Sequence, residues 1–250
     1  MNDAPALRQA EVGIAVSNAT DVAKGAASAV LTGEGLSAIV DLVTNGRRIY
    51  QRINTWIVNK ISRTILKSAF VVLAFLVTGQ YVVSASAMLL LVFLNDATKI
   101  SLSTDNVRWS QKPETWDITS LVKVAALLGV VMVAEGFGLT FVGLRFFGLT
   151  AAGAALHMLS FLTMFFFAQF SILVVRERRH FWESRPSRAM MASVIVSLGL
   201  GVVIGFYGLP DLPPLPLYQV LAVLGYSFAV SLVLNDYIKY FLVRKLGVRW

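Results

Sequence analysis

Long, unbroken apolar runs dominate the chain after about residue 60. A helix needs about 20 residues, at about 1.5 Å of rise each, to cross the hydrocarbon core of a bilayer. Several runs reach this length with few charges, and polar connectors separate them. The pattern predicts six transmembrane helices, at Ile61–Gln80, Ser86–Thr104, Ile118–Val142, Leu156–Val175, Ala189–Gly208 and Leu217–Asn235. We therefore expect a mainly α, polytopic membrane protein whose transmembrane domain covers residues 61–235.

The first part of the chain has short apolar runs interleaved with polar residues. Val12–Val16 reads as a short strand, Thr20–Ala27 as a helix opened by a capping threonine, and Ala29–Leu31 as a second strand. This alternation predicts a fragment of an α/β domain over residues 1–35. Residues 36–60 have helical periodicity and run without a break into the first span, so we expect a stalk helix there.

The distribution of charge predicts the topology. The chain has 22 Lys and Arg against 14 Asp and Glu, a net charge of +8, and is 56% hydrophobic. The connectors Lys99–Lys123 and Arg176–Arg188 are basic, whereas the others carry little charge. The positive-inside rule then predicts a multi-pass protein of the plasma (inner) membrane with both termini in the cytosol, including a basic tail over residues 236–250. Membrane orientation explains the basic excess, so no nucleic-acid partner is expected. The lack of cysteine excludes disulfides and thiolate sites within this chain.

Two charged residues fall inside the first two predicted spans. At about 1.5 Å per residue, Lys67 lies about 20 Å from the outer end of the first span, and Asp96 lies about 15 Å into the second. Because a charge in lipid is costly, we expect each to face the protein interior and the other residue. Asp96 is then a candidate proton carrier, with Lys67 as its counter-charge and with Asn95 and Thr98 as hydrogen-bond partners. A static buried ion pair, or a Lys67 side chain that extends to the cytosol, is the alternative.

Glu135, in the third span, is a further candidate for contact with an ion. Gly136 and Gly138 beside it make close helix packing an equal explanation. We expect Gln169, in the fourth span, to form hydrogen bonds across helices. The aromatic run Phe161–Phe170 is expected to supply lipid-facing and packing bulk.

The amino terminus reads NDAPAL from Asn2 to Leu7. An Asn-Asp pair in a loop can hydrogen-bond a phosphoryl group and the water shell of Mg²⁺, although the same residues also suit the start of a helix. The longer string NDAPALRQAEVGIAVSNATDVAKGAASAVLT resembles the end of the phosphorylation domain of P-type ATPases, cation pumps of the haloacid dehalogenase superfamily. This resemblance implies that Asn2 and Asp3 belong to the site of the phosphorylated aspartate, with Asp3 touching Mg²⁺ through water.

A second string, FLNDATKISLSTDNV, is similar to the sixth membrane helix of the plasma-membrane proton-pump branch. In that branch a Leu-Asn-Asp string carries the transported proton and a basic residue of the fifth helix is its partner. Asp96 matches the acceptor, and Lys67 stands where well-known members have Arg. The resemblance implies the membrane portion of an ATP-driven proton exporter. A pump of another cation such as Mg²⁺ or Ca²⁺, a six-helix secondary transporter or channel, and a non-catalytic membrane fragment are the alternatives.

Several parts of the family pattern have no counterpart in this sequence. The phosphorylated aspartate, the nucleotide domain and the first four membrane helices are missing, so we expect no ATP hydrolysis by this chain alone. The resemblance implies Mg²⁺ and ATP as cofactors of the whole pump. It also implies membrane lipid, the transported cation and the missing amino-terminal portion of the pump as partners.

Overall fold

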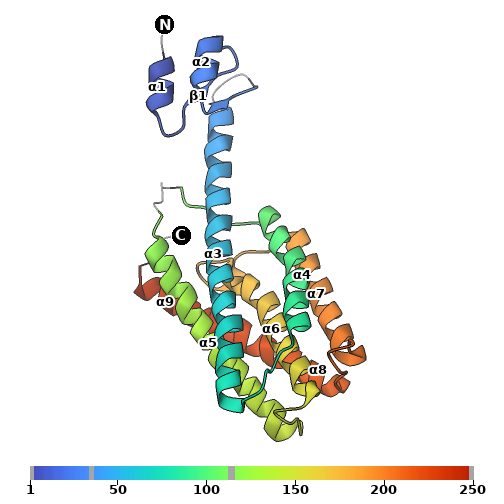
Figure 1. Ribbon diagram of the computed structural model, residues 1–250. Helices are drawn as coiled ribbons and strands as arrows, with labels where there is room; N and C mark the ends of the chain where they lie inside the picture. Colours follow the sequence, from blue (N-terminus) through green and yellow to red (C-terminus); the bar gives the residue numbers. More distant parts are fainter. Residues whose placement is uncertain (1–2, 34–36, 112–115, 248–250) are drawn as a thin grey trace. The chain divides into compact units, whose positions relative to one another are not determined.

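The polar start of the chain forms short helices and strands. The computed structural model describes residues 3–33, 37–111 and 116–247, and the chain divides into two units, Met1–Ile49 and Tyr50–Trp250 (Figure 1). The first unit begins with four short elements, which are α1 (Ala4–Gln9), β1 (Ile14–Ala15), α2 (Asp21–Ala26) and β2 (Ala29–Val30).

The strand, helix and second strand predicted for this segment are confirmed. Strands β1 and β2 pair in parallel, with Ile14 opposite Ala29. Helix α2 connects them, as a parallel pair requires a crossover, and Thr20 caps this helix by accepting a hydrogen bond from the Ala23 N–H at 3.4 Å. That the segment is the remnant of a phosphorylation domain stays a prediction.

Helix α3 is the longest element of the described chain. It runs from Ser37 to Thr78, 42 residues, without interruption. The predicted stalk and first span are therefore one continuous helix. In the second unit the buried residues of α3 are mainly polar up to Arg63 and apolar after it. The first set is Gln51, Asn54, Thr55, Asn59, Ser62 and Arg63, with the apolar Val58 among them, and the second is Leu66, Phe70 and Ala74.

The described residues contain six helices that are long and apolar enough to cross a membrane, as the sequence predicts. After α3, these are α4 (Ala85–Ser101) with the 3₁₀ turn η1 (Leu102–Thr104), α5 (Ile118–Phe146), α6 (Ala154–Val175), α7 (Arg188–Tyr207), and the last helix, which is made of α8 (Leu217–Ala229), the π-helical segment η3 (Val230–Asn235) and α9 (Asp236–Lys245). A short 3₁₀ turn, η2 (Phe181–Glu183), lies between α6 and α7.

The last helix is longer than predicted. The sequence places the end of the sixth span at Asn235 and a basic tail after it, whereas the apolar helix continues from Leu217 to Lys245, 29 residues. Lys239, which was assigned to the tail, has no exposed surface. The charge of Asp236 and Lys239 suggested an end of the span, but these two side chains pair with each other, which allows the helix to continue through buried surroundings.

Helix α5 begins with a side-chain cap. The Asp117 carboxylate accepts a hydrogen bond from the Ser120 backbone N–H at 3.0 Å. Hydrogen bonds from Ser120 lower the pKa of Asp117, because they stabilise the charged form. The cap therefore fixes where the connector ends and the third span starts.

Helix α6 is the centre of the second unit. It packs against α4, α5, α7 and α8, and its whole apolar window is buried. The expectation that part of Phe161–Phe170 faces lipid is wrong, because every residue of this run is buried inside the bundle. A helix that is apolar on all sides is typical of the interior of a bundle as well as of a lipid-exposed span, and hydropathy alone does not separate the two.

Close packing of α6 and α7 depends on Gly201. A Cβ atom on this glycine would lie 2.6 Å from Phe166 Cε1 and 2.8 Å from Phe165 Cδ1. We expect Gly201→Ala to lower the free energy of unfolding by about 1–3 kcal/mol through overpacking. Gly199→Ala is the matched control, because a Cβ atom there meets nothing within 4 Å, and it should be neutral or stabilising by up to about 1 kcal/mol. Detergent-denaturant titration followed by circular dichroism measures both changes, and equal values would contradict the packing argument.

Candidate ion-transport site

A buried network of polar side chains joins α4, α6 and α7. Gln169 donates from Nε2 to Asn95 Oδ1 at 2.8 Å and accepts at Oε1 from the Thr98 hydroxyl at 2.7 Å. The Thr98 hydroxyl also lies 3.3 Å from Ser197 Oγ. Asn95, Thr98 and Gln169 are all at most 3% exposed. The predicted bonding of Gln169 across helices is confirmed. The side chains of Asn95 and Thr98 hydrogen-bond to this glutamine. Among the described residues, they form no hydrogen bond with the Asp96 carboxylate, contrary to the expectation.

Asp96 lies on a different face of α4. Its Oδ1 accepts a hydrogen bond from Lys99 Nζ at 2.7 Å, which is an ion pair between residues three positions apart. The Asp96 side chain is 48% exposed and the Lys99 side chain 24% exposed. Residues three apart on a helix lie on one face, so this pair forms within α4 alone.

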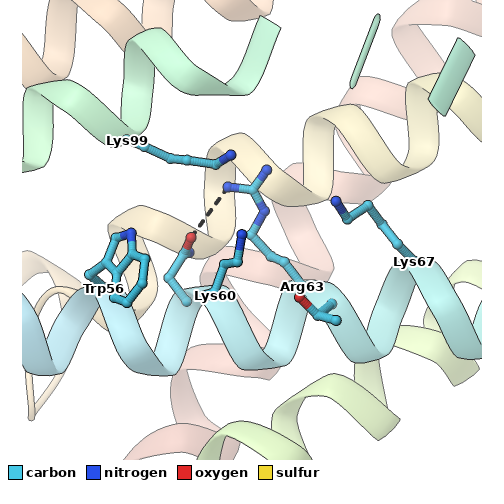
Figure 2. Close-up of a pocket in the computed structure, with 7 residues that line it drawn as sticks. Trp56, Lys60, Arg63, Lys67 and Lys99 are labelled. Atoms are coloured by element: carbon cyan, nitrogen blue, oxygen red, sulfur yellow. Dashed lines mark hydrogen bonds between the residues drawn. The ribbon is translucent and has the colours of Figure 1, made fainter. Parts of the chain in front are cut away.

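Lys67 lies in a pocket that is lined mainly by basic side chains (Figure 2). The cavity measures about 20 Å³ and is lined by Trp56, Asn59, Lys60, Arg63, Thr64 and Lys67 of α3 and by Lys99 of α4. The guanidinium of Arg63, which is 6% exposed, donates to Asn59 Oδ1 at 3.2 Å. In Figure 2 the Lys99 ammonium and the Arg63 guanidinium point into the same space. Four cations therefore gather around this pocket, which we call the basic pocket.

The expected direct contact between Lys67 and Asp96 is wrong for this structure. Among the residues that the structure describes, the ion pair of Asp96 is with Lys99, and none within 4.0 Å joins Asp96 to Lys67. Lys99 links the two predicted residues, because it pairs with Asp96 and lines the basic pocket together with Lys67. The sequence does contain the signal for this pair, which is the three-residue spacing of Asp96 and Lys99.

Glu135 lies apart from Asp96, on α5. It is 7% exposed, and its Oε2 accepts a hydrogen bond from Asn235 Nδ2 of the last helix at 2.8 Å. Tyr226 donates to the Glu135 backbone carbonyl at 3.0 Å. The two candidate acids thus have separate surroundings, because Asp96 pairs within α4 and Glu135 bonds to the last helix.

The predicted phosphorylation-site residues are at the start of the chain. Asn2 lies outside the described residues. Asp3 is exposed and precedes α1, and its side chain makes no capping hydrogen bond. One exposed carboxylate is not a donor set that fixes Mg²⁺ or a nucleotide, which take several oxygen ligands. No chemical step is therefore assigned to Mg²⁺ or ATP on the residues of this chain.

Two buried charge clusters were missed by sequence reasoning. Asp105, after α4, forms an ion pair with Arg176, at the end of α6, with Oδ2 to Nε at 2.7 Å and both side chains at most 1% exposed. Asp236 pairs with Lys239 at 2.8 Å and with His180 at 2.6 Å. Partners 71 and 56 positions apart in the chain cannot be recognised from one sequence, whereas the three-residue spacing of Asp236 and Lys239 was a usable signal.

The fold and these sites together define a class of protein. Six apolar helices make a polytopic membrane domain, and ionisable side chains lie within its spans at Lys67, Asp96 and Glu135. Charged residues inside membrane segments are costly and are typical of ion pathways. The class is thus a polytopic membrane domain with ionisable side chains inside its spans.

Comparison with known proteins identifies the family. Residues 80–241 match the family described as "Cation transporting ATPase, C-terminus", so the chain belongs to this family. The resemblance to the C-terminal part of P-type ATPases, close to the plasma-membrane proton-pump branch, is thereby confirmed.

Three relatives match most of this chain, and each match covers only part of the relative's own length. A protein of Methanocaldococcus jannaschii named as a cation-transporting ATPase is 33% identical over 250 residues, which is 99% of this chain and 30% of that protein. A protein of Dictyostelium discoideum named as a plasma membrane ATPase is 28% identical over 85% of this chain and 21% of its own length. Plasma membrane ATPase 1 of Saccharomyces cerevisiae is 30% identical over 78% of this chain and 21% of its own length. The chain thus spans between a fifth and a third of these relatives.

Proposed function

We propose that this chain is the membrane portion of an ATP-driven proton exporter, and that Asp96 carries the proton. The observation that carries the proposal is the position of Asp96, which is the sole carboxylate in the sequence of the first two spans and is paired with a lysine of the basic pocket. The relatives named as plasma membrane ATPases support the choice of a proton.

The proton exchange at Asp96 is a simple acid–base step. The carboxylate takes a proton from hydronium on one side of the membrane, leaving water, and later returns it to water on the other side. While Asp96 is ionised, Lys99 neutralises it at 2.7 Å. Once Asp96 is protonated, Lys99 loses this partner and can turn toward the basic pocket, which it already lines.

Both helices of the site are hydrogen-bonded to α6, and α3 reaches it through Asn59 Nδ2, which donates to Ser171 Oγ at 3.2 Å. The network of Gln169 with Asn95 and Thr98 fixes α4 to α6. Helix α3 carries Lys60, Arg63 and Lys67 on one unbroken element. We infer that movement of α3 during a pump cycle changes the distance of these cations from Asp96 and so drives proton uptake and release.

The remainder of the proposal concerns the whole pump. Mg²⁺ and ATP would act in an amino-terminal portion of the pump, and Asn2 and Asp3 would complete that site. Both termini of this chain would lie in the cytosol, in accord with the basic connectors. Another cation such as Mg²⁺ or Ca²⁺ is the alternative, since the M. jannaschii relative is named for no particular ion.

A chimeric pump tests the proposed function. This chain would replace the matching region of the M. jannaschii relative, and the product would be reconstituted in vesicles. We expect ATP-dependent acidification of the vesicle lumen when the catalytic domains face outward, and none with this chain alone. ATP-dependent uptake of Mg²⁺ or Ca²⁺ without acidification would overturn the choice of the proton. A chimera that binds and hydrolyses ATP but moves no ion would overturn the assignment as a pump.

A further inference from the structure

Among the residues that the structure describes, the buried carboxylate of Glu135 has no cationic partner. One of its oxygens, Oε2, accepts from Asn235 Nδ2 at 2.8 Å. The other, Oε1, is buried and has no hydrogen-bond partner among the described residues. No ion pair within 4.0 Å involves this carboxylate in the described part of the chain. The described residues around Glu135 therefore include no cation paired with its carboxylate.

The partner of Glu135 lies in the π-helical segment η3. This segment packs against α5 and α6, and it ends at Asn235. Asn235 Oδ1 and Ser231 Oγ are buried and also lack hydrogen-bond partners among the described residues. Single π-helical turns inside α-helices occur frequently at functional sites, because they open the regular ladder and redirect side chains.

A small cavity lies beside Asn235. It measures about 10 Å³, near the lower limit for one water molecule, and is lined by Asn235, by Ser62 of α3 and Ser171 of α6, and by the apolar side chains Leu128, Met132, Val174 and Val175. The Ser62 and Ser171 hydroxyls donate to backbone carbonyls of their own helices. The Ser62 hydroxyl therefore offers the cavity an acceptor oxygen, as Asn235 Oδ1 does, whereas Ser171 Oγ already accepts from Asn59 Nδ2 at 3.2 Å.

Two buried acceptor oxygens of this region have no hydrogen-bond donor among the described residues. Glu135 Oε1 and Asn235 Oδ1 are acceptors, and the Ser62 oxygen of the cavity is available as an acceptor too. The Ser231 hydroxyl can donate its own hydrogen, but Glu135 Oε1 and Asn235 Oδ1 each need a donor. A proton on Glu135 supplies one donor and removes the unbalanced charge, and one water in the cavity supplies two more.

We propose that Glu135, Asn235 and the adjacent cavity form a second proton-binding site in the membrane domain, in which Glu135 holds the proton and the cavity holds a water molecule. Hydronium gives its proton to the Glu135 carboxylate, which becomes a carboxylic acid, and water remains. The site lies between α5, η3, α3 and α6 and shares no residue with the Asp96 pair.

The titratable groups around this site are few. The hydroxyl of Tyr226, on α8, donates to the backbone carbonyl of Glu135 and not to its carboxylate. The carboxylate of Asp236, next to Asn235, is bonded to His180 and Lys239. The cavity-lining residues of α3, α5 and α6 are uncharged. The protonation state of Glu135 can therefore be followed without a strongly coupled neighbour.

Infrared spectroscopy of the full chain in lipid vesicles tests the proposal without ATP or transport. We expect a protonated-carboxyl C=O band at pH 7 that shifts in D₂O, disappears in Glu135→Gln, and persists in the matched control Glu183→Gln and in Asp96→Asn. Absence of the band from the wild type, or its persistence in Glu135→Gln, overturns the proposal. Because no pumping is measured, the result does not depend on the proposed function.

A measurement on the wild type covers the case in which Glu135→Gln does not fold. The chain has six glutamates, so a sample with ¹³C-labelled glutamate carboxyls and ¹⁵N-labelled asparagine side chains gives few solid-state NMR signals. We expect one glutamate in the acid form at pH 7, with its carboxyl carbon in direct contact with an asparagine amide nitrogen. If every glutamate is ionised at pH 7, or if the acid form is remote from asparagine, Glu135 is not the proton site.

Discussion

Asp96→Asn is expected to abolish proton transport by the chimeric pump, down to the level of vesicles without pump. The amide keeps the size and the hydrogen-bonding oxygen of the carboxylate, but it does not take up and release a proton in the accessible pH range. It also removes the 2.7 Å ion pair with Lys99. Because Asp96 is about half exposed, the change should leave membrane insertion and the amount of folded chimera unaltered. Lumenal acidification, measured with a pH-sensitive dye at equal pump content, gives the result.

Asp211→Asn is the matched control for this substitution. Asp211 is an exposed loop residue whose carboxylate accepts a hydrogen bond from Ser86 at 2.8 Å, so the same chemical change occurs outside the spans. We expect it to pump at the wild-type rate. Acidification by Asp96→Asn at a comparable rate would remove Asp96 from the proposed role, and equal loss in both variants would point to a general effect on folding.

The membrane architecture could be predicted closely because it depends on one property of the sequence. Hydropathy and run length alone locate the six spans, and the predicted Leu156–Val175 differs from helix α6 by two residues at one end. The same property does not state which face of a span meets lipid. Helix α6 was therefore recognised as a helix but not as the buried centre of the bundle.

The partners of individual side chains were much harder to predict. Asn95, Thr98 and Asp96 are consecutive or nearly so, yet the first two turn toward Gln169 and the third toward Lys99. Helical periodicity separates such faces only when the orientation of the helix in the bundle is known. The resemblance to the proton pumps points to Lys67 as the partner of Asp96. The nearer cation is Lys99, which lies on the same helix as Asp96.

The buried pair of Asp105 and Arg176 shows a further limit. These residues are 71 positions apart, and each lies at the polar end of a span where an exposed charge is the ordinary expectation. Instead, Asp105 Oδ1 accepts from the Ser187 N–H at 2.8 Å, before α7, and its backbone carbonyl accepts from Arg52 of α3. Asp105 therefore connects the interior of α3, at Arg52, with the ends of α4 and α6 and the start of α7.

Arg176→Met is accordingly expected to lower the free energy of unfolding by about 3–5 kcal/mol, because it leaves the Asp105 carboxylate buried without a counter-charge. The guanidinium also donates to the Ser184 carbonyl at 2.8 Å and to the Asn106 carbonyl at 2.5 Å, and methionine replaces neither bond. Methionine retains most of the volume, so the loss reports the charge and hydrogen bonds more than a cavity. Detergent-denaturant titration of the full chain measures the effect.

Arg108→Met makes the same change at an exposed pair and serves as the control. Arg108 lies 3.2 Å from Glu183 with 58% of its side chain exposed, so its loss should cost at most about 1 kcal/mol. The double variant Asp105→Leu/Arg176→Met should be less destabilised than the sum of its single variants, because removing both charges leaves none unpaired. Equal costs for Arg176→Met and Arg108→Met, or strict additivity in the double variant, would show that the buried pair does not hold these helix ends together.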